Sequence, residues 1–300
     1  MSAIESLRTA VGTLRRHPVL VLGGACYGLV VMPQRALQLA GVPIAPALLQ
    51  MLTFFVTPFV LAGVVGMART ALVGETSVDE LVAVGKDRYV DLLLATLLAF
   101  GIKLAFGIVL VVLAIGLLAT GGSGTGALVG AALVVGVVLV YLAVLMLIQF
   151  YPVIVVVDDA GPVDAVTDSV DFVRSNPVGT LGFTAVTVLL GAVAALPVTG
   201  VAAYSFVTSG AESGGSPGPI GGGMSPGGPG AGAGATNGTA ALGDALASGG
   251  LGLSTPEVLA LSLVSVAAAA LLVAFRLTYA TAFYRSNARS IEERVLDEEW

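Results

Sequence analysis

Two basic residues lie inside long apolar stretches, where a charge needs a chemical reason. Lys103 falls near the middle of the stretch 92–118, and Arg276 lies several residues inside the end of 256–283. A charge at bilayer depth costs at least about 2.5–3.5 kcal/mol unless it snorkels, pairs or faces water. Apart from Glu257, at the outer end of 256–283, no acidic residue lies inside an apolar stretch, so neither base has an obvious counter-ion at its own depth. Lys103 and Arg276 are therefore the candidate binding residues.

The two bases differ in how easily they reach polar headgroups. Arg276 is close to Arg285, and its long side chain is expected to snorkel to the headgroups. Lys103 is harder to place in this way, so we expect it to face the interior of a helix bundle. There it would bind an anion, backbone carbonyls or a lipid phosphate. The alternative is a shifted span boundary that brings Lys103 nearer the interface.

The other residues that could act in catalysis or bind a metal do not form a catalytic or metal-binding set. Asp158 and Asp159 could bind a cation or act as acid and base, but a solvated helix end is the default in an acidic protein. His17 is the only histidine, and Cys26 is the only cysteine, which excludes an intramolecular disulfide. Cys26 is interpreted as a buried, inert thiol, with a lipoprotein cysteine as the alternative. The sequence predicts no enzyme, metal or cofactor.

The composition indicates that lipid is the solvent for most of the chain. Hydrophobic residues make up 56% of the 300 residues, charged residues make up 11%, and the mean hydropathy is +0.98. A soluble domain of this length needs far more charge to cover its surface. The 19 acidic residues outnumber the 13 Lys and Arg. This balance resembles that of proteins from salt-loving archaea, because high salt screens repulsion between carboxylates.

Six stretches are long and apolar enough to cross a membrane as helices, for which about 20 residues suffice. We therefore predict an all-α polytopic integral membrane protein with spans at 18–39, 46–71, 92–118, 127–157, 178–207 and 256–283. Span 1 could instead be a signal peptide, but the segment before it is too long and too acidic for one. Spans 2, 4 and 5 contain prolines that favour kinks, namely Pro58, Pro152 and Pro197.

The basic residues outside the spans fall almost entirely on one side of this six-span layout. Only Arg35 falls on the opposite side. The shared side contains Arg8, Arg15, Arg16, Arg69, Lys86, Arg88, Arg174, Arg285, Arg289 and Arg294. Lys and Arg are enriched in cytoplasmic loops. The asymmetry predicts a multi-pass protein of the cell membrane with the N- and C-termini in the cytoplasm.

Two amphipathic segments precede spans 1 and 5 and are expected to be interfacial helices. Their apolar residues match at a constant offset of 159, with Ile4, Leu7, Val11 and Leu14 in segment 2–16 and Val163, Val166, Val170 and Val173 in segment 162–175. The match predicts an internal repeat of interfacial helix and helical pair. The alternative is that an amphipathic segment precedes any helix that enters a membrane, without an internal repeat. The segment around Val78 and Leu81 could be a degenerate third copy.

The connections differ in composition. The segment 209–250 is rich in Gly, Ser and Pro and is expected to be a flexible outer loop. It contains Asn237 in an Asn-Gly-Thr pattern, a candidate glycosylation site. The short connection 120–125 predicts antiparallel neighbours on either side, and Gly126 and Gly130 favour close helix contact there. We treat 1–300 as a single membrane domain, in which residues 1–158 contain spans 1–4 and residues 159–300 contain spans 5 and 6.

The region after span 4 resembles a known group of proteins. The similarity rests on the run 153–157, Val-Ile-Val-Val-Val, followed by Asp158, Gly161, Ala165, Ser169, Arg174, Asn176 and Pro177. This pattern is similar to that of uncharacterised six-span haloarchaeal membrane proteins and of the membrane domain of glycerophosphodiester phosphodiesterases. The resemblance implies a six-helix integral domain without established activity. The phosphodiesterase's catalytic domain has no counterpart in this chain.

The sequence therefore predicts a non-enzymatic membrane protein that interacts with lipids or membrane partners. Membrane lipids are the expected ligands, a homo-oligomer or a membrane protein partner is possible, and no nucleic acid is expected. The alternative is a small permease for an amphiphilic or anionic solute, favoured by the repeat, the prolines and Lys103. A central polar cavity would favour the permease, whereas a dry, Leu/Val-packed centre would argue against it.

Overall fold

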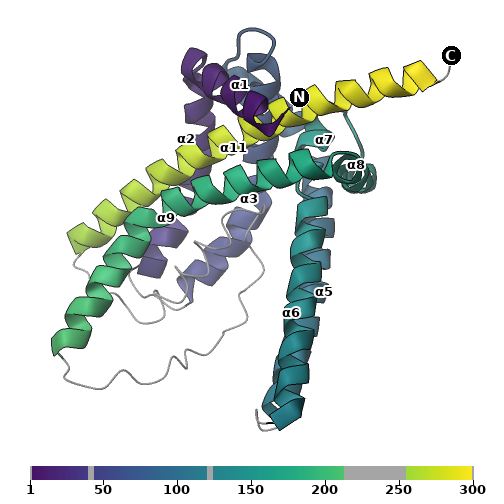
Figure 1. Cartoon of the computed structure of the whole chain (residues 1–300). Helices are drawn as coiled ribbons and strands as arrows, with labels where there is room; N and C mark the ends of the chain where they lie inside the picture. Colours follow the sequence, from purple (N-terminus) through teal and green to yellow (C-terminus); the bar gives the residue numbers. More distant parts are fainter. Residues whose placement is uncertain (1, 40–43, 120–123, 213–254, 299–300) are drawn as a thin grey trace.

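The protein is described by a computed structural model covering residues 2–39, 44–119, 124–212 and 255–298. Within these residues the secondary structure is entirely helical (Figure 1). The helices are α1 (Ala3–Arg16), α2 (Val19–Leu39), α3 (Ala45–Ala71), α4 (Val78–Asp87), α5 (Tyr89–Ala119), α6 (Gly124–Leu147), α7 (Tyr151–Val157), α8 (Pro162–Ser175), α9 (Pro177–Glu212) and α11 (Thr255–Glu298). The all-α prediction is confirmed.

Six helical segments have the length and composition of membrane spans, as predicted. They are Val19–Leu37, Ala45–Ala71, Tyr89–Leu117, Leu128–Val157, Pro177–Leu196 and Ala260–Ala288. The predicted loop 209–250 begins inside α9, and the rest of it, including Asn237, lies outside the described residues. The division of the domain between residues 158 and 159 stays a prediction.

Three features of the described helices differ from the prediction or go beyond it. Span 4 is not one continuous helix, because α6 ends at Leu147 and α7 begins at Tyr151. Pro152 lacks the N–H that would pair with the carbonyl of Ile148, and its ring crowds that carbonyl. The chain after span 6 continues as helix to Glu298, and the segment between spans 2 and 3 contains α4.

The amphipathic segments before spans 1 and 5 are helices with matching bounds. α1 and α8 differ by 159 residues at both ends, and their buried positions match at Ser6, Ala10 and Thr13 against Ala165, Ser169 and Phe172. Ile4 and Val163, which also correspond, are each 60% exposed. Each helix thus packs on the bundle through one face and leaves apolar residues on another, as an interfacial helix requires. The internal repeat itself stays a prediction.

The two ends of the bundle are not equally packed. α5 and α6 form an antiparallel hairpin that runs away from the other helices (Figure 1). Only 6% of the most apolar 18-residue stretch of each of these spans is buried, against 44% of the corresponding stretch of α3. A Cβ added to Gly130 would lie 2.5 Å from Leu117 Cδ1, so this glycine makes the predicted contact between the two helices. The core lies where α1, α4, α7 and α8 meet the spans, around buried Leu20, Val64 and Ile154.

The chain ends of the described fold lie at this packed end. The hydroxyl of Tyr279 in α11 donates to the backbone oxygen of Ala3 (3.0 Å), and the hydroxyls of Ser6 and Ser286 are hydrogen-bonded (3.3 Å). The beginning of α1 therefore lies against the later part of the sixth candidate span in α11.

Candidate anion site at the helix break

Lys103 and Arg276 line one small cavity inside the bundle. Its volume is ≈ 20 Å³, enough for about one water molecule. The other lining residues are Ala99, Leu145, Ile148, Gln149 and Tyr151. The cavity therefore lies where α5 and α11 meet the break between α6 and α7. Both cations face it, and none of its lining residues is acidic, so it suits an anionic group.

The position of Arg276 differs from the sequence expectation. We expected its side chain to snorkel toward the headgroups, but it lines the same cavity as Lys103. It also lies near the phenol groups of Tyr27 of α2 and Tyr151 of α7. α11 continues as helix past Arg276 and packs along α2 and α3, so the guanidinium is surrounded by neighbouring helices. Lys103, in contrast, faces the bundle as expected.

Polar residues around the break fix the walls of the cavity. The Gln149 amide donates to Thr184 Oγ1 of α9 (3.1 Å), and the Thr184 hydroxyl donates back to Gln149 Oε1 (3.3 Å). The Tyr151 hydroxyl is hydrogen-bonded to Thr96 Oγ1 of α5 (3.3 Å). These bonds tie the break to the helices on both sides. The amide and the phenol could also donate hydrogen bonds to an anion.

Ser169 of α8 stabilises the break directly. Its hydroxyl donates to the backbone oxygen of Leu147 (2.7 Å) and accepts from the backbone N–H of Phe150 (3.1 Å). Both backbone groups belong to the interrupted turn, where the helical pairing is lost. Ser169 is fully buried, so water does not reach these two backbone groups to take the place of its hydroxyl. A single hydroxyl thus pairs with one backbone donor and one backbone acceptor. Without a partner, each would cost free energy in an apolar environment.

Aromatic rings surround the same turn. Phe150 is fully buried, and its ring centroid lies 5.0 Å from Phe172 of α8, 5.0 Å from Phe183 of α9 and 5.7 Å from Phe283 of α11. Aromatic pairs at these separations are favourable. The cluster fixes the direction in which α7 leaves the break, and therefore the direction of Tyr151.

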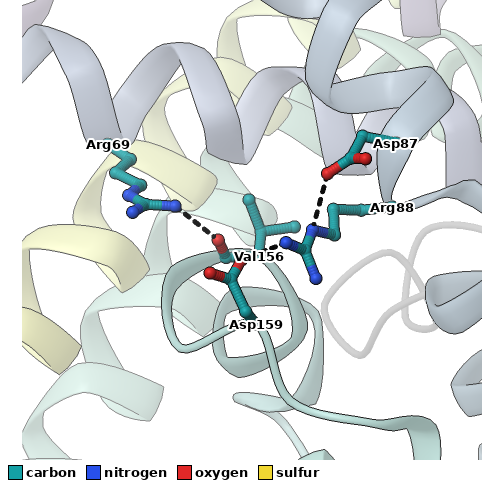
Figure 2. A network of polar contacts seen from close by, with 5 residues as sticks. All are labelled: Arg69, Asp87, Arg88, Val156 and Asp159. Carbon is teal, nitrogen blue, oxygen red and sulfur yellow. Dashed lines mark hydrogen bonds and ion pairs between the residues drawn. The ribbon is translucent and has the colours of Figure 1, made fainter.

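A network of polar contacts holds the far end of α7 (Figure 2). Arg69 Nη1 at the end of α3 donates to the backbone oxygen of Val156 (3.0 Å). Arg88, between α4 and α5, forms ion pairs from Nη2 to Asp159 Oδ1 (2.5 Å) and from Nε to Asp87 Oδ2 (3.0 Å). Because the last carbonyls of a helix have no partner within it, the contact from Arg69 stabilises the end of α7.

The paired carboxylates after α7 have structural partners. Asp158 accepts a hydrogen bond from the hydroxyl of Tyr284 in α11, and Asp159 binds Arg88. Asp159 has φ 57°, a left-handed conformation that aspartate tolerates better than most residues. These contacts fit a structural role at the α7–α8 corner, rather than the cation site or acid–base pair that the sequence left open.

Asp168 provides a pH-dependent prediction. Partial desolvation raises the pKa of Asp168 above the ordinary value of 3.8, and the neighbouring charges of Asp164, Asp158 and Asp171 add to the rise. The folded protein therefore holds this proton more tightly than the unfolded chain. Its contribution to stability is fully present below pH 3.8 and is lost as the pH rises through the raised pKa.

We therefore expect Asp168→Asn to stabilise the protein at pH 7, where the wild-type carboxylate is charged. The gain should be less than about 1 kcal/mol, because the residue is exposed and solvent screens the charges. It should shrink as the pH falls toward 3.8 and also shrink in high salt. Melting temperatures of both proteins in detergent at pH 7 and pH 4 check this. An equal difference at both values would contradict it.

The remaining candidates have no role at the cavity. His17 follows α1, where its backbone N–H donates to the oxygen of Thr13 (2.9 Å). Cys26 is half-buried in α2 against the core. Among the described residues, no three His, Cys, Asp or Glu lie close enough to hold a metal ion.

Sequence reasoning missed Gln149, Tyr151 and Ser169. Gln149 and Tyr151 are polar residues near the end of the apolar run of span 4, which is a usable signal for a polar site at that depth. Ser169 lay within the family-like pattern but had no assigned role. Its bonds reach back by 19 and 22 residues to the break, and helical periodicity does not reveal such contacts.

Comparisons with known proteins identify a family but no activity. A search of the curated proteins found no match, and a search of solved structures found none either. A family model matches residues 1–287, which includes all six candidate spans except the last residue of the sixth. The chain therefore belongs to the family described as Domain of unknown function (DUF7847).

Proposed function

We propose that this protein is a non-enzymatic integral membrane protein that binds an anionic phospholipid group at the Lys103–Arg276 cavity. The convergence of these two cations on one cavity carries the proposal. They come from α5 and α11, which are far apart in the sequence, and the cavity adds an amide and a phenol as hydrogen-bond donors. Ionisable groups inside spans commonly mark functional sites.

The surroundings of the cavity support a lipid as the source of the anion. The α5–α6 hairpin exposes large apolar side chains along most of its length, among them Ile108, Val112 and Leu139. Acyl chains can therefore reach the base of the hairpin, where Lys103 and Leu145 lie. The resemblance to the membrane domain of glycerophosphodiester phosphodiesterases is also compatible with a role at membrane lipids, without carrying over their activity.

The alternative is a small permease for an amphiphilic or anionic solute. The break between α6 and α7 favours it, because transporters use interrupted helices to line a binding site. The cavity beside the break holds about one water molecule, and the core around it is packed with apolar side chains. A permease would need a chamber that encloses the whole solute, whereas a lipid need only bring one anionic oxygen against the two cations, so we rank the permease second.

We further infer that the packed end of the bundle faces the cytoplasm and that the protein is a multi-pass protein of the cell membrane. Ten of the 13 basic residues lie on that side of the six-span layout. Membrane lipids are then the natural partners, and a homo-oligomer or a membrane protein partner is compatible with the exposed hairpin. Labelling of Trp300 from outside intact cells would overturn this orientation.

Native mass spectrometry with added phosphatidylglycerol tests the lipid proposal. Lys103→Leu is expected to lower the retained fraction of this lipid severalfold, because a basic residue contributes about 1 kcal/mol to binding of an anionic lipid. Lys103→Arg is the matched control and is expected to keep retention, since it preserves the charge.

Three outcomes would contradict this proposal. Equal retention by Lys103→Leu and wild type would remove the cavity as the lipid site. Displacement of the lipid by inorganic phosphate would indicate a site for a free anion instead, and anion flux into liposomes that Lys103→Leu abolishes would favour the permease.

A further inference from the structure

A second recess lies on the outside of the bundle, where α3, α4 and α5 meet. It is an open groove with a volume of ≈ 370 Å³, lined by Phe55, Val56, Phe59, Lys86 and Tyr89. Ligand pockets commonly have volumes of about 300–1,000 Å³. Three aromatic rings and one ammonium group thus face a space large enough for a portion of an amphiphile.

Tight contacts between the three helices shape this groove. The Tyr89 hydroxyl donates to the backbone oxygen of Phe55 (3.1 Å), which fastens the start of α5 to α3. A Cβ added to Gly85 would lie 3.0 Å from both Cε2 and the backbone oxygen of Phe59, so α4 rests directly against this residue. The groove is therefore a fixed feature of the fold.

The groove lies where a charged helix gives way to lipid-facing surface. α4 contains Asp79, Glu80, Lys86 and Asp87, whereas α5 exposes apolar side chains from Val90 onward. On α3, the exposed apolar residues Leu48, Met51, Leu52 and Phe55 end at the groove, and the following turns are buried. Tyrosines commonly mark such a transition at the headgroup level. A lipid at this transition would place its headgroup at the polar end of the groove and its acyl chains at the apolar end.

Lys86 is the only charged residue among those that line the groove, and its ammonium favours an anionic headgroup. The Arg88 guanidinium is occupied by Asp87 and Asp159, and within the described portion of the chain no ion pair holds the exposed Lys86. We propose that the groove binds one anionic phospholipid, with its phosphate on the Lys86 ammonium and one acyl chain along Phe55 and Phe59. This site is separate from the Lys103–Arg276 cavity and goes beyond the function proposed above.

A tryptophan placed in the groove can report which lipid occupies it. The chain has one tryptophan, Trp300, so Trp300→Phe with Phe55→Trp gives a single reporter in the full-length protein. Vesicles of brominated phosphatidylglycerol should quench it with an apparent affinity about fivefold higher than vesicles of brominated phosphatidylcholine, the preference that one basic residue supplies. Lys86→Gln should remove this preference, and Lys86→Arg should retain it.

Val112→Trp in the same background is the matched control, because Val112 is exposed on α5 far from Lys86. It should be quenched equally by the two lipids. Equal quenching at Phe55→Trp, or a preference that survives Lys86→Gln, would overturn the proposal. Lys103→Leu should leave the preference at Phe55→Trp unchanged, so failure of the cavity proposal and failure of the groove proposal are distinguishable.

Discussion

Replacing Gly24 with alanine is expected to cost at least about 3 kcal/mol of stability, the upper end of the usual cost of overpacking. Gly24 lies in α2 where this helix packs against α11. A Cβ at this position would lie 2.0 Å from the backbone oxygen of Ala270 and 3.0 Å from Ala274 Cβ. The first neighbour is backbone, so a change of side-chain rotamer cannot relieve the clash and the helices must separate.

The consequences should spread beyond one contact. Gly28, one turn further, would place a Cβ 2.9 Å from Val266 Cγ1, so the two helices approach closely over two turns. Small residues permit such close approach in membrane proteins. Because α11 also carries Arg276 and packs on α1 and α9, separation from α2 should disturb both the cavity and the packed end of the bundle.

Thermal unfolding of detergent-purified protein, followed by circular dichroism, measures this effect. Gly101→Ala is the matched control, since it also introduces a methyl group into an apolar span but meets nothing within 4 Å. It should change stability by less than about 1 kcal/mol. If the two variants melted at the same temperature, the close approach of α2 and α11 would be wrong.

The elements of this fold follow closely from the sequence because they depend on local patterns. Apolar length alone gives the six spans, and a period of 3.6 residues gives α1 and α8 with nearly the correct bounds. The capping box of Ser2 and Glu5, in which each side chain bonds the other's backbone N–H, also lies within three residues of sequence.

The break in span 4 could not be predicted from local sequence patterns. The apolar run continues through the break, and a proline such as Pro152 is ordinarily tolerated in a membrane helix. Whether a helix kinks or breaks there depends on what satisfies the freed backbone groups, and Ser169 of α8 does so. The meeting of Lys103 with Arg276 likewise depends on how α5 and α11 pack, which no local pattern records.

The sequence contains one signal for the groove at Lys86. Tyr89 stands at the first position of a span, directly after a charged helix, and that placement is typical of residues at the headgroup level. The contribution of Phe55 and Phe59 could not be anticipated, because α4 must first fold back onto α3. Sequence therefore indicated the depth of this site, and only the tertiary contacts gave its walls.

Ser169→Ala is expected to destabilise the protein by about 1–3 kcal/mol for each backbone group it leaves without a partner. The hydroxyl serves both the oxygen of Leu147 and the N–H of Phe150, and both lie where the α6–α7 helix is interrupted. Water cannot easily take its place, since Ser169 is fully buried among α6, α7 and α8. Hydrogen exchange at the Phe150 amide should become faster as the break loosens.

Thr167→Ala is the matched control on the same helix. Its hydroxyl bonds only carbonyls of α8 itself, those of Val163 and Asp164, and its side chain is exposed. Such a surface change should alter stability by no more than about 0.5 kcal/mol. The comparison separates loss of any hydroxyl on α8 from loss of the one that bridges the break. If Ser169→Ala matched Thr167→Ala in melting temperature and in exchange at Phe150, the break would not depend on Ser169. The cavity formed by Lys103 and Arg276 would then need another explanation for its fixed walls.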